Sequence, residues 1–281
     1  MKLDFWNHIY EHFNPVAFHI FGIGVHWYGI MYVLALVTAL AVGKYFLKKD
    51  NYGFTSQELD RFFIYIEIGV ILGARLGYIL FYDPHTSYYL THPWQIFNPY
   101  NQEGQFIGIR GMSYHGAIIG FLIGAWLFCK RNNVSFGKIM DLVAISVPLG
   151  YVFGRIGNFL NQELVGRATD VPWGIYVDGV LRHPSQLYEA LLEGFGVFAV
   201  VYLYRKYKKF DGELLLVYGA SYGLFRGFAE AFRAPDPQIG YLCCNFVTLG
   251  MVLSLSMTLL AIILWMYFYN KFKKEGKLLQ K

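Results

Sequence analysis

Hydrophobic residues gather along this chain in long runs that are separated by short polar stretches. Seven runs reach or approach the ~20 residues that an α-helix needs to cross the hydrocarbon core of a bilayer. The predicted membrane-spanning segments are residues 27–47, 61–82, 113–130, 139–154, 186–204, 213–232 and 245–269. The fourth segment is the shortest, and it runs directly into the polar stretch GRIGNFLNQELVG at residues 154–166. The pattern predicts an all-α polytopic membrane protein, with about seven transmembrane helices in a single domain over residues 1–281.

The composition excludes a soluble globular protein. Of the 281 residues, 56% are hydrophobic and only 15% are charged, whereas a soluble domain carries about 25% charged residues. The mean hydropathy of +0.36 agrees with a membrane protein. Cys129, Cys243 and Cys244 form neither a metal-binding spacing nor a disulfide framework, so we expect them to be packing residues.

The distribution of positive charge predicts the orientation in the membrane. Cytoplasmic loops of membrane proteins are enriched in Lys and Arg. If the N-terminus lies outside and the C-terminus inside, most of the 24 Lys and Arg residues fall on the cytoplasmic side. These residues are Lys44, Lys48, Lys49, Arg61, Lys130, Arg131, Lys138, Arg205, Lys206, Lys208, Lys209, Lys271, Lys273, Lys274, Lys277 and Lys281. The net charge of +5 therefore needs no nucleic-acid partner, because anionic lipid of the inner leaflet accounts for it.

Positive residues that remain on the predicted outer side are almost all arginines. They are Arg75, Arg110, Arg155, Arg167, Arg182, Arg226 and Arg233, with Lys2 the exception. A guanidinium group presents a fixed fork of donors that suits phosphate or carboxylate. Some of these arginines are therefore expected to bind an anionic ligand, and structural ion pairing is the alternative for each one.

Glycines recur every four residues in four of the predicted segments. The repeats are Gly69, Gly73 and Gly77 in the second segment, Gly116, Gly120 and Gly124 in the third, Gly150 and Gly154 in the fourth, and Gly219, Gly223 and Gly227 in the sixth. Small residues at this spacing allow helix backbones to approach closely in lipid. We expect these glycines to be packing surfaces that bring the four segments together.

Polar side chains cluster where several of these segments reach the predicted outer face. His115 begins the third segment, and Asn158 lies one helical turn beyond Arg155 at the end of the fourth, before Glu163. Tyr222, Arg226 and Glu230 share one helical stripe in the sixth segment. The remaining members are Tyr28 at the start of the first segment and Arg75 in the second.

Together these residues predict an outward-facing pocket for an anionic lipid headgroup. Two arginines suit a phosphodiester and stabilise the charge that develops when it leaves, and a histidine takes up a proton near neutral pH. In a purely structural alternative, Arg226 and Glu230 neutralise each other. A transporter or channel for an anionic solute is the competing function, but the chain shows neither an internal repeat nor polar residues along its full depth. The HExxH and GxxxxGK[ST] motifs are absent, so the nucleophile is expected to come from a second substrate.

The motifs resemble those of bacterial prolipoprotein diacylglyceryl transferases. GRIGNFLNQELVG at 154–166 matches the signature of that family throughout. Further matching blocks cover most of the chain in the family's order: HWYG at 26–29, GARLGYILFY at 73–82, GMSYHGAIIG at 111–120, RHPSQLYE at 182–189 and YGLFRGFAEAFR at 222–233. The resemblance implies an enzyme of the bacterial cytoplasmic membrane. Such an enzyme moves diacylglyceryl from phosphatidylglycerol to the lipobox cysteine of a prolipoprotein signal peptide and releases glycerol phosphate.

The resemblance also assigns site residues and implies no metal or cofactor. Arg155 corresponds to a residue that binds the phosphate of phosphatidylglycerol, and Arg226 to its partner in stabilising the leaving group. Further positions that match functionally important ones are His115, Asn158, Glu163, Gly166, Tyr28, Tyr222 and Glu230. His115 either removes the thiol proton or orients the substrate. Because the loop between Gly166 and Arg182 is short, we expect a small extracytoplasmic head at about residues 164–185, with short strands near 173–177.

Overall fold

The computed structural model describes residues 2–20, 22–100, 103–105, 108–109, 111–235 and 239–279. Arg110 and Lys281 lie outside these residues, as does the side chain of Lys2. The chain divides into two compact units, which are described separately. The first unit comprises Met1–Tyr52 with Gly137–Lys281, and the second comprises Gly53–Phe136.

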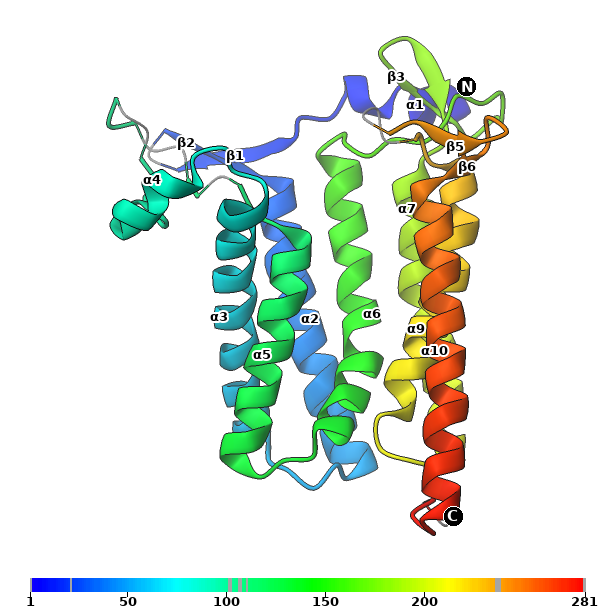
Figure 1. The fold of residues 1–281 in the computed structure, drawn as a ribbon. Helices are drawn as coiled ribbons and strands as arrows, with labels where there is room; N and C mark the ends of the chain where they lie inside the picture. The colour runs from blue at the N-terminus through cyan, green and yellow to red at the C-terminus, as the bar shows by residue number, and fades with distance from the viewer. Residues whose placement is uncertain are drawn as a thin grey trace. The chain divides into compact units, whose positions relative to one another are not determined.

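Long helices dominate the first unit (Figure 1). They are α2 (Trp27–Asp50), α6 (Phe136–Leu160), α7 (Ser185–Glu189) continued by a π-helical stretch (Ala190–Gly196) and α8 (Val197–Tyr204), then α9 (Glu213–Ala229) and α10 (Leu249–Lys274). Helices α9 and α10 pack along each other, and a Cβ on Gly223 would lie 2.6 Å from the Ser254 carbonyl oxygen. The glycine at this point therefore permits the close approach that the four-residue spacing predicts.

Short antiparallel hairpins and a short N-terminal helix accompany these long helices. The hairpins are β1 (Val16–Ile20) with β2 (Ile23–His26), β3 (Ile175–Val177) with β4 (Val180–Arg182), and β5 (Tyr241–Cys243) with β6 (Val247–Thr248). Within this unit, α1 (Lys2–Asn7), β3, β5 and β6 lie at one end of the long helices, and the C-terminus lies at the other (Figure 1). The β3–β4 hairpin confirms the strands expected near 173–177, whereas the other two hairpins were not predicted.

The second unit is a pair of closely packed helices, α3 (Ser56–Phe81) and α5 (Tyr114–Asn132), with α4 (Thr86–Thr91) and a 3₁₀ turn (Pro93–Gln95) between them in the chain. Thr55 begins α3 with a complete capping box to Glu58. Ser113 begins α5 by accepting a hydrogen bond from the backbone N–H of Gly116 at 3.1 Å. Both helices thus start where a side chain satisfies an otherwise unpaired N–H group.

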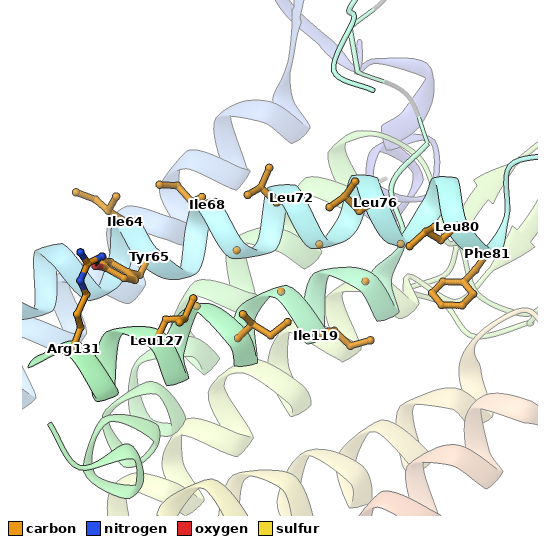
Figure 2. Close-up of a pocket in the computed structure, with 17 residues that line it drawn as sticks. Ile64, Tyr65, Ile68, Leu72, Leu76, Leu80, Phe81, Ile119, Leu127 and Arg131 are labelled. Atoms are coloured by element: carbon orange, nitrogen blue, oxygen red, sulfur yellow. Dashed lines mark hydrogen bonds between the residues drawn. The ribbon is translucent and has the colours of Figure 1, made fainter. Parts of the chain in front are cut away.

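Glycines form the contact between α3 and α5. A Cβ on Gly77 would lie 2.8 Å from the Cα of Gly116, and one on Gly73 would lie 2.8 Å from the Cα of Gly120. Above this contact lies an apolar groove of about 550 Å³, along which Ile68 and Leu72 project from α3 (Figure 2). The two glycine repeats that the spacing indicated are therefore a shared packing surface.

Five helices in the described part of the chain are long and apolar enough to cross a membrane: Trp27–Asp50, Ser56–Phe81, Phe136–Leu160, Ser185–Tyr207 and Leu249–Lys274. The protein is therefore mostly helical, as expected. The third and sixth predicted segments are not among these five helices. The third corresponds to α5, which carries Lys130 and Arg131 near its end, and the sixth corresponds to α9, which has only 17 residues. The fourth segment is longer than predicted, because α6 continues through Arg155 and Asn158 to Leu160.

Candidate functional site

Three arginines and three glutamates meet in the first unit and form the charge cluster described below. The members are Arg155 from α6, Glu189 and Glu193 from α7 and the π-helical stretch, Arg226 from α9, and Glu230 and Arg233 just beyond it. Their formal charges cancel. A neutral cluster is the arrangement in which buried charges are tolerated, because each one has an opposite partner.

Glu189 is the centre of the charge cluster and is completely buried. Its Oε2 lies 3.1 Å from Arg155 Nε and 3.0 Å from Arg226 Nη1. Its Oε1 lies 3.2 Å from Arg233 Nη1. One carboxylate therefore brings the guanidinium groups of Arg155 and Arg226 to the same place, although they lie 71 positions apart in the chain.

Arg155 continues the cluster toward the polar end of α6. Its Nη1 donates to Asn158 Oδ1 at 3.2 Å, and Asn158 Nδ2 donates to Glu163 Oε1 at 2.7 Å. Arg155 Nε also donates to the Tyr151 hydroxyl at 2.6 Å, and that hydroxyl donates to Glu193. Because α6 continues past Arg155, the one-turn spacing of Arg155 and Asn158 places them side by side, as the sequence predicted.

Arg226 and Glu230 form the ion pair that their spacing allowed, with Nη2 and Oε2 at 2.6 Å. The Glu230 carboxylate is also bound by the Thr248 hydroxyl at 3.1 Å. Gly250 leaves room for this carboxylate, since a Cβ there would lie 2.7 Å from Glu230 Cδ. The pairing does not isolate Arg226, because its other Nη atom reaches Glu189 and Glu193.

Both central arginines keep part of their side chains accessible. The side chains of Arg155 and Arg226 are 16% and 15% exposed, whereas those of Glu189 and Glu193 are fully buried. Among the described residues, no hydrogen bond reaches Nη2 of Arg155. The charge cluster therefore holds Glu189 and Glu193 inside the protein and leaves part of the guanidinium surface of Arg155 and Arg226 accessible.

Glu189 and Glu193 were not predicted as site residues, although Glu189 ends the block RHPSQLYE. A signal was present, because two carboxylates four residues apart inside an apolar segment are costly unless they are paired. The backbone between Ala190 and Gly196 is π-helical, a conformation that is frequent at functional sites.

Two tyrosines of the predicted site are close to this cluster or to α6. The Tyr222 ring packs edge-on against that of Tyr151, with 5.9 Å between centroids. Tyr28 begins α2 next to Gly157 of α6, where an added Cβ would lie 3.3 Å from Tyr28 Cδ2. Tyr28 is exposed, whereas Tyr151 and Tyr222 help to enclose the arginines.

Gly166 joins the site to the β3–β4 hairpin through its backbone. Its N–H donates to the His183 carbonyl at 3.1 Å, and its carbonyl accepts from Arg182 Nη1 at 3.2 Å. A Cβ on Gly166 would lie 2.7 Å from the Phe232 carbonyl oxygen, so only glycine fits. Burial lowers the pKa of the neighbouring His183 below its ordinary value.

His115 and Arg75 belong to the second unit. His115 Nδ1 lies 3.3 Å from the Tyr82 hydroxyl. Arg75 is almost fully buried, and it donates to the carbonyl oxygens of Ile96 at 2.5 Å and Gly111 at 3.2 Å. These contacts hold the segment after α4 and the start of α5 against α3. The expected roles of His115 and Arg75 toward lipid stay predictions.

A second polar cluster lies in the first unit around the start of α6. The fully buried Asp141 accepts from Lys208 Nζ at 2.9 Å and from the N–H groups of Gly212 and Leu214 at 2.9 and 2.8 Å. Burial by itself lowers the pKa of Lys208, but Asp141 and Asp211 raise it above the ordinary value. Every carboxylate oxygen of Asp141 is thus satisfied, so this cluster is a structural link.

In the described part of the chain, no group of three or more His, Cys, Asp or Glu side chains is placed to hold a metal ion.

Known proteins resemble the chain over nearly its whole length. A family profile described as prolipoprotein diacylglyceryl transferase matches residues 15–267. Similar curated proteins carry the name phosphatidylglycerol–prolipoprotein diacylglyceryl transferase. One from Campylobacter lari is 62% identical over 268 residues, covering 95% of this chain and 98% of the relative. Another from Wolinella succinogenes is 62% identical over 274 residues, covering 98% and 99%, and one from Aliarcobacter butzleri is 56% identical over 260 residues, covering 92% and 95%.

Proposed function

The chain belongs to the prolipoprotein diacylglyceryl transferase family, and we propose that its charge cluster is the site where the phosphate of phosphatidylglycerol binds and departs. The chain is an enzyme of lipoprotein maturation that transfers diacylglyceryl from phosphatidylglycerol to a prolipoprotein. The alternative of an anionic-solute transporter is not favoured by these relatives.

The reaction requires a carbon–oxygen bond of the lipid to break. The precursor cysteine loses its thiol proton, and the sulfur attacks the glyceryl carbon that is bonded to a phosphate oxygen. A carbon–sulfur bond forms, the carbon–oxygen bond breaks, and its electron pair leaves with glycerol phosphate. The departing group carries additional negative charge, which is stabilised by preorganised positive groups.

Arg155 and Arg226 are suited to that task because both reach Glu189. Both guanidinium groups bind the same carboxylate, since Glu189 Oε2 lies 3.1 Å from Arg155 Nε and 3.0 Å from Arg226 Nη1. This carboxylate holds the two guanidinium groups together. Preorganisation of this kind means that little reorganisation is needed when charge develops on the leaving oxygen.

The remaining residues of the predicted site have supporting roles in this proposal. Asn158 and Glu163 extend the hydrogen-bonded chain from Arg155, and Glu230 orients Arg226. Tyr222 and Tyr28 supply aromatic surface for the lipid, and Gly166 fixes the backbone beyond Glu163. We assign Arg75 to lipid binding through the segments that it holds. His115 either accepts the thiol proton or orients the substrate, since a cysteine thiol near pKa 8.5 needs help to ionise at neutral pH.

We also propose a cellular location and an orientation for the protein. Seven helices cross the bacterial cytoplasmic membrane with the N-terminus outside, so that α5 and α9 join the five longer helices. The small head and the charge cluster then face the outer leaflet, where the lipobox cysteine of the signal peptide meets phosphatidylglycerol. The distribution of Lys and Arg supports this orientation.

Arginine-to-lysine substitutions test the phosphate site while keeping the charge. In Arg155→Lys and Arg226→Lys, the single ammonium group replaces the fork of donors, so kcat/KM for phosphatidylglycerol should fall about 10²–10³-fold. Arg205→Lys is the matched control, because Arg205 pairs with Asp50 away from the charge cluster, and it should retain activity. Normal turnover of either site variant, with the protein folded, would remove that arginine from the mechanism.

A further inference from the structure

Glu163 lies in an unusual turn at the end of α6, which we call the Glu163 turn (residues 162–164). Gln162 has φ +58° and Leu164 has φ +57°, so both neighbours of Glu163 adopt the left-handed conformation. Residues other than glycine rarely adopt it, and such strain persists only where surrounding contacts enforce it. The contacts that enforce this turn therefore determine where the Glu163 carboxylate lies.

Two side chains at the start of α7 donate hydrogen bonds to backbone carbonyl groups of the Glu163 turn. Gln186 Nε2 donates to the Glu163 carbonyl oxygen at 2.6 Å, and Ser185 Oγ donates to that of Leu164 at 3.2 Å. Both side chains are completely buried. On the other side, the Glu163 N–H donates to the Asn158 carbonyl at 3.1 Å, which links the turn to α6.

The N-terminal segment holds the same turn from a third direction. Gln162 Nε2 donates to the carbonyl oxygens of Phe13 at 2.9 Å and Tyr10 at 3.3 Å. The Tyr10 ring packs against Phe159 of α6, with 5.2 Å between centroids. Residues 10–13, which precede the region matched by the family profile, are thus fastened to the end of α6 next to Glu163.

Gln186 also carries an unsatisfied oxygen. Its Oε1 is buried and has no hydrogen-bond partner among the described residues. The orientation of the amide is set by the Glu163 carbonyl, which accepts only from the NH₂ end. A buried acceptor without a partner among the described residues is costly, and the NH₂ end of the same amide compensates by binding the Glu163 carbonyl.

We propose that Gln162 and Gln186 are positioning residues that fix the Glu163 carboxylate against Asn158, and through Asn158 the guanidinium group of Arg155. The inference rests on the proposed function, in which Glu163 belongs to the phosphate-binding chain. Gln162 contacts backbone, and Gln186 contacts backbone and the Tyr10 hydroxyl at 3.5 Å, so neither touches the charge cluster. The effect of each glutamine on the reaction therefore passes through the geometry of the turn.

Glutamine-to-methionine substitutions test the positioning role at nearly constant side-chain volume. Gln186→Met and Gln162→Met remove the amide contacts from two different elements. With the intact membrane enzyme in detergent, phosphatidylglycerol and a lipobox peptide, kcat should fall about tenfold or more, because a misplacement near 1 Å costs up to ~10²-fold. The KM for the peptide should stay unchanged. Gln57→Met is the matched control, since Gln57 is exposed in the first turn of α3, and it should keep full activity.

A double-mutant cycle with Glu163→Gln distinguishes the positioning role of the glutamines from the role of Glu163 in the phosphate-binding chain. If the glutamines act through Glu163, Gln186→Met should cost little further activity in the Glu163→Gln background. If Glu163→Gln alone leaves turnover intact, the role of Glu163 fails and the positioning role fails with it. If Glu163→Gln lowers turnover while both methionine variants are fully active, or if the losses multiply, only the positioning role is wrong. Thermal unfolding identifies a variant that is inactive because it is unfolded. If both methionine variants are unfolded, the glutamines are merely structural and the inference is wrong.

Discussion

At the scale of single residues, the site depends on a balance of charge that holds arginines in an apolar part of the protein. Glu189 binds Arg155, Arg226 and Arg233 at once, and it is fully buried. Removing one member of a buried ion pair is more costly than replacing the whole pair, because the remaining charge loses its partner. Glu189 is therefore the residue on which the geometry of both central arginines depends.

Substitution of Glu189 should reduce stability and activity together. Glu189→Gln leaves three arginines facing two carboxylates, which should lower the free energy of unfolding by about 3 kcal/mol. The apparent unfolding temperature in detergent, compared with that of the wild type, measures the effect. An unchanged unfolding temperature would show that the arginines do not need this carboxylate.

The sequence predicted the arginines of the site better than their partners. The stripe of Tyr222, Arg226 and Glu230 follows from helical spacing alone, and the Arg226–Glu230 ion pair is present. Glu189 meets Arg155 only because α6 and α7 pack in the folded chain, and no local spacing contains that information. The backbone contacts of Arg75 likewise depend on a loop whose course the hydrophobic pattern does not specify.

At the scale of elements, glycine contacts determine how closely the helices approach. The spacing of Gly73 and Gly120 predicted packing surfaces, and in the second unit the two glycines face each other across α3 and α5. The apolar groove beside them presents isoleucine and leucine side chains, which suits contact with acyl chains (Figure 2). Tight helix pairs of this kind lose their packing when a single methyl group is added.

Gly73→Ala should separate α3 from α5. The added Cβ would lie 2.8 Å from the Cα of Gly120, and no side chain can move to relieve this contact between backbones. We expect a loss of about 1–3 kcal/mol in the free energy of unfolding, measured as a lower unfolding temperature in detergent.

Gly219→Ala is the matched control within a helix. A Cβ there would meet only the Ala261 Cβ at 3.5 Å, an ordinary contact, so stability should be unchanged or slightly higher. Equal unfolding temperatures for the two variants would contradict the packing role of the α3–α5 glycines.

Element boundaries were predicted less well than the elements themselves. The polar residues at 155–160 suggested that the fourth segment ends at 154, but α6 continues to Leu160 because Arg155 and Asn158 find partners inside the protein. Hydropathy alone cannot reveal those partners. The β1–β2 and β5–β6 hairpins were missed because their short strands carry no long alternation of polar and apolar residues.

At the scale of the whole molecule, the proposed orientation places the charge cluster at the outer leaflet. The two neighbouring cysteines in and after β5 provide a direct test, because Cys243 and Cys244 are exposed and Cys129 is buried. The packing role expected from the sequence is therefore wrong for Cys243 and Cys244. A membrane-impermeant maleimide should label the protein in spheroplasts before permeabilisation, and the double substitution of Cys243 and Cys244 by Ser should abolish labelling. Labelling that needs permeabilisation would reverse the orientation.

In the proposed reaction, the precursor supplies the sulfur and this chain supplies the charged site. The most direct measurement is mass spectrometry of a lipobox peptide incubated with phosphatidylglycerol and purified enzyme in which Cys129, Cys243 and Cys244 are replaced by Ala. We predict that the peptide gains the mass of a diacylglyceryl group on its cysteine and that glycerol phosphate is released in equal amount. A peptide that gains only an acyl mass, or that remains unmodified by the folded cysteine-free enzyme, would contradict the account.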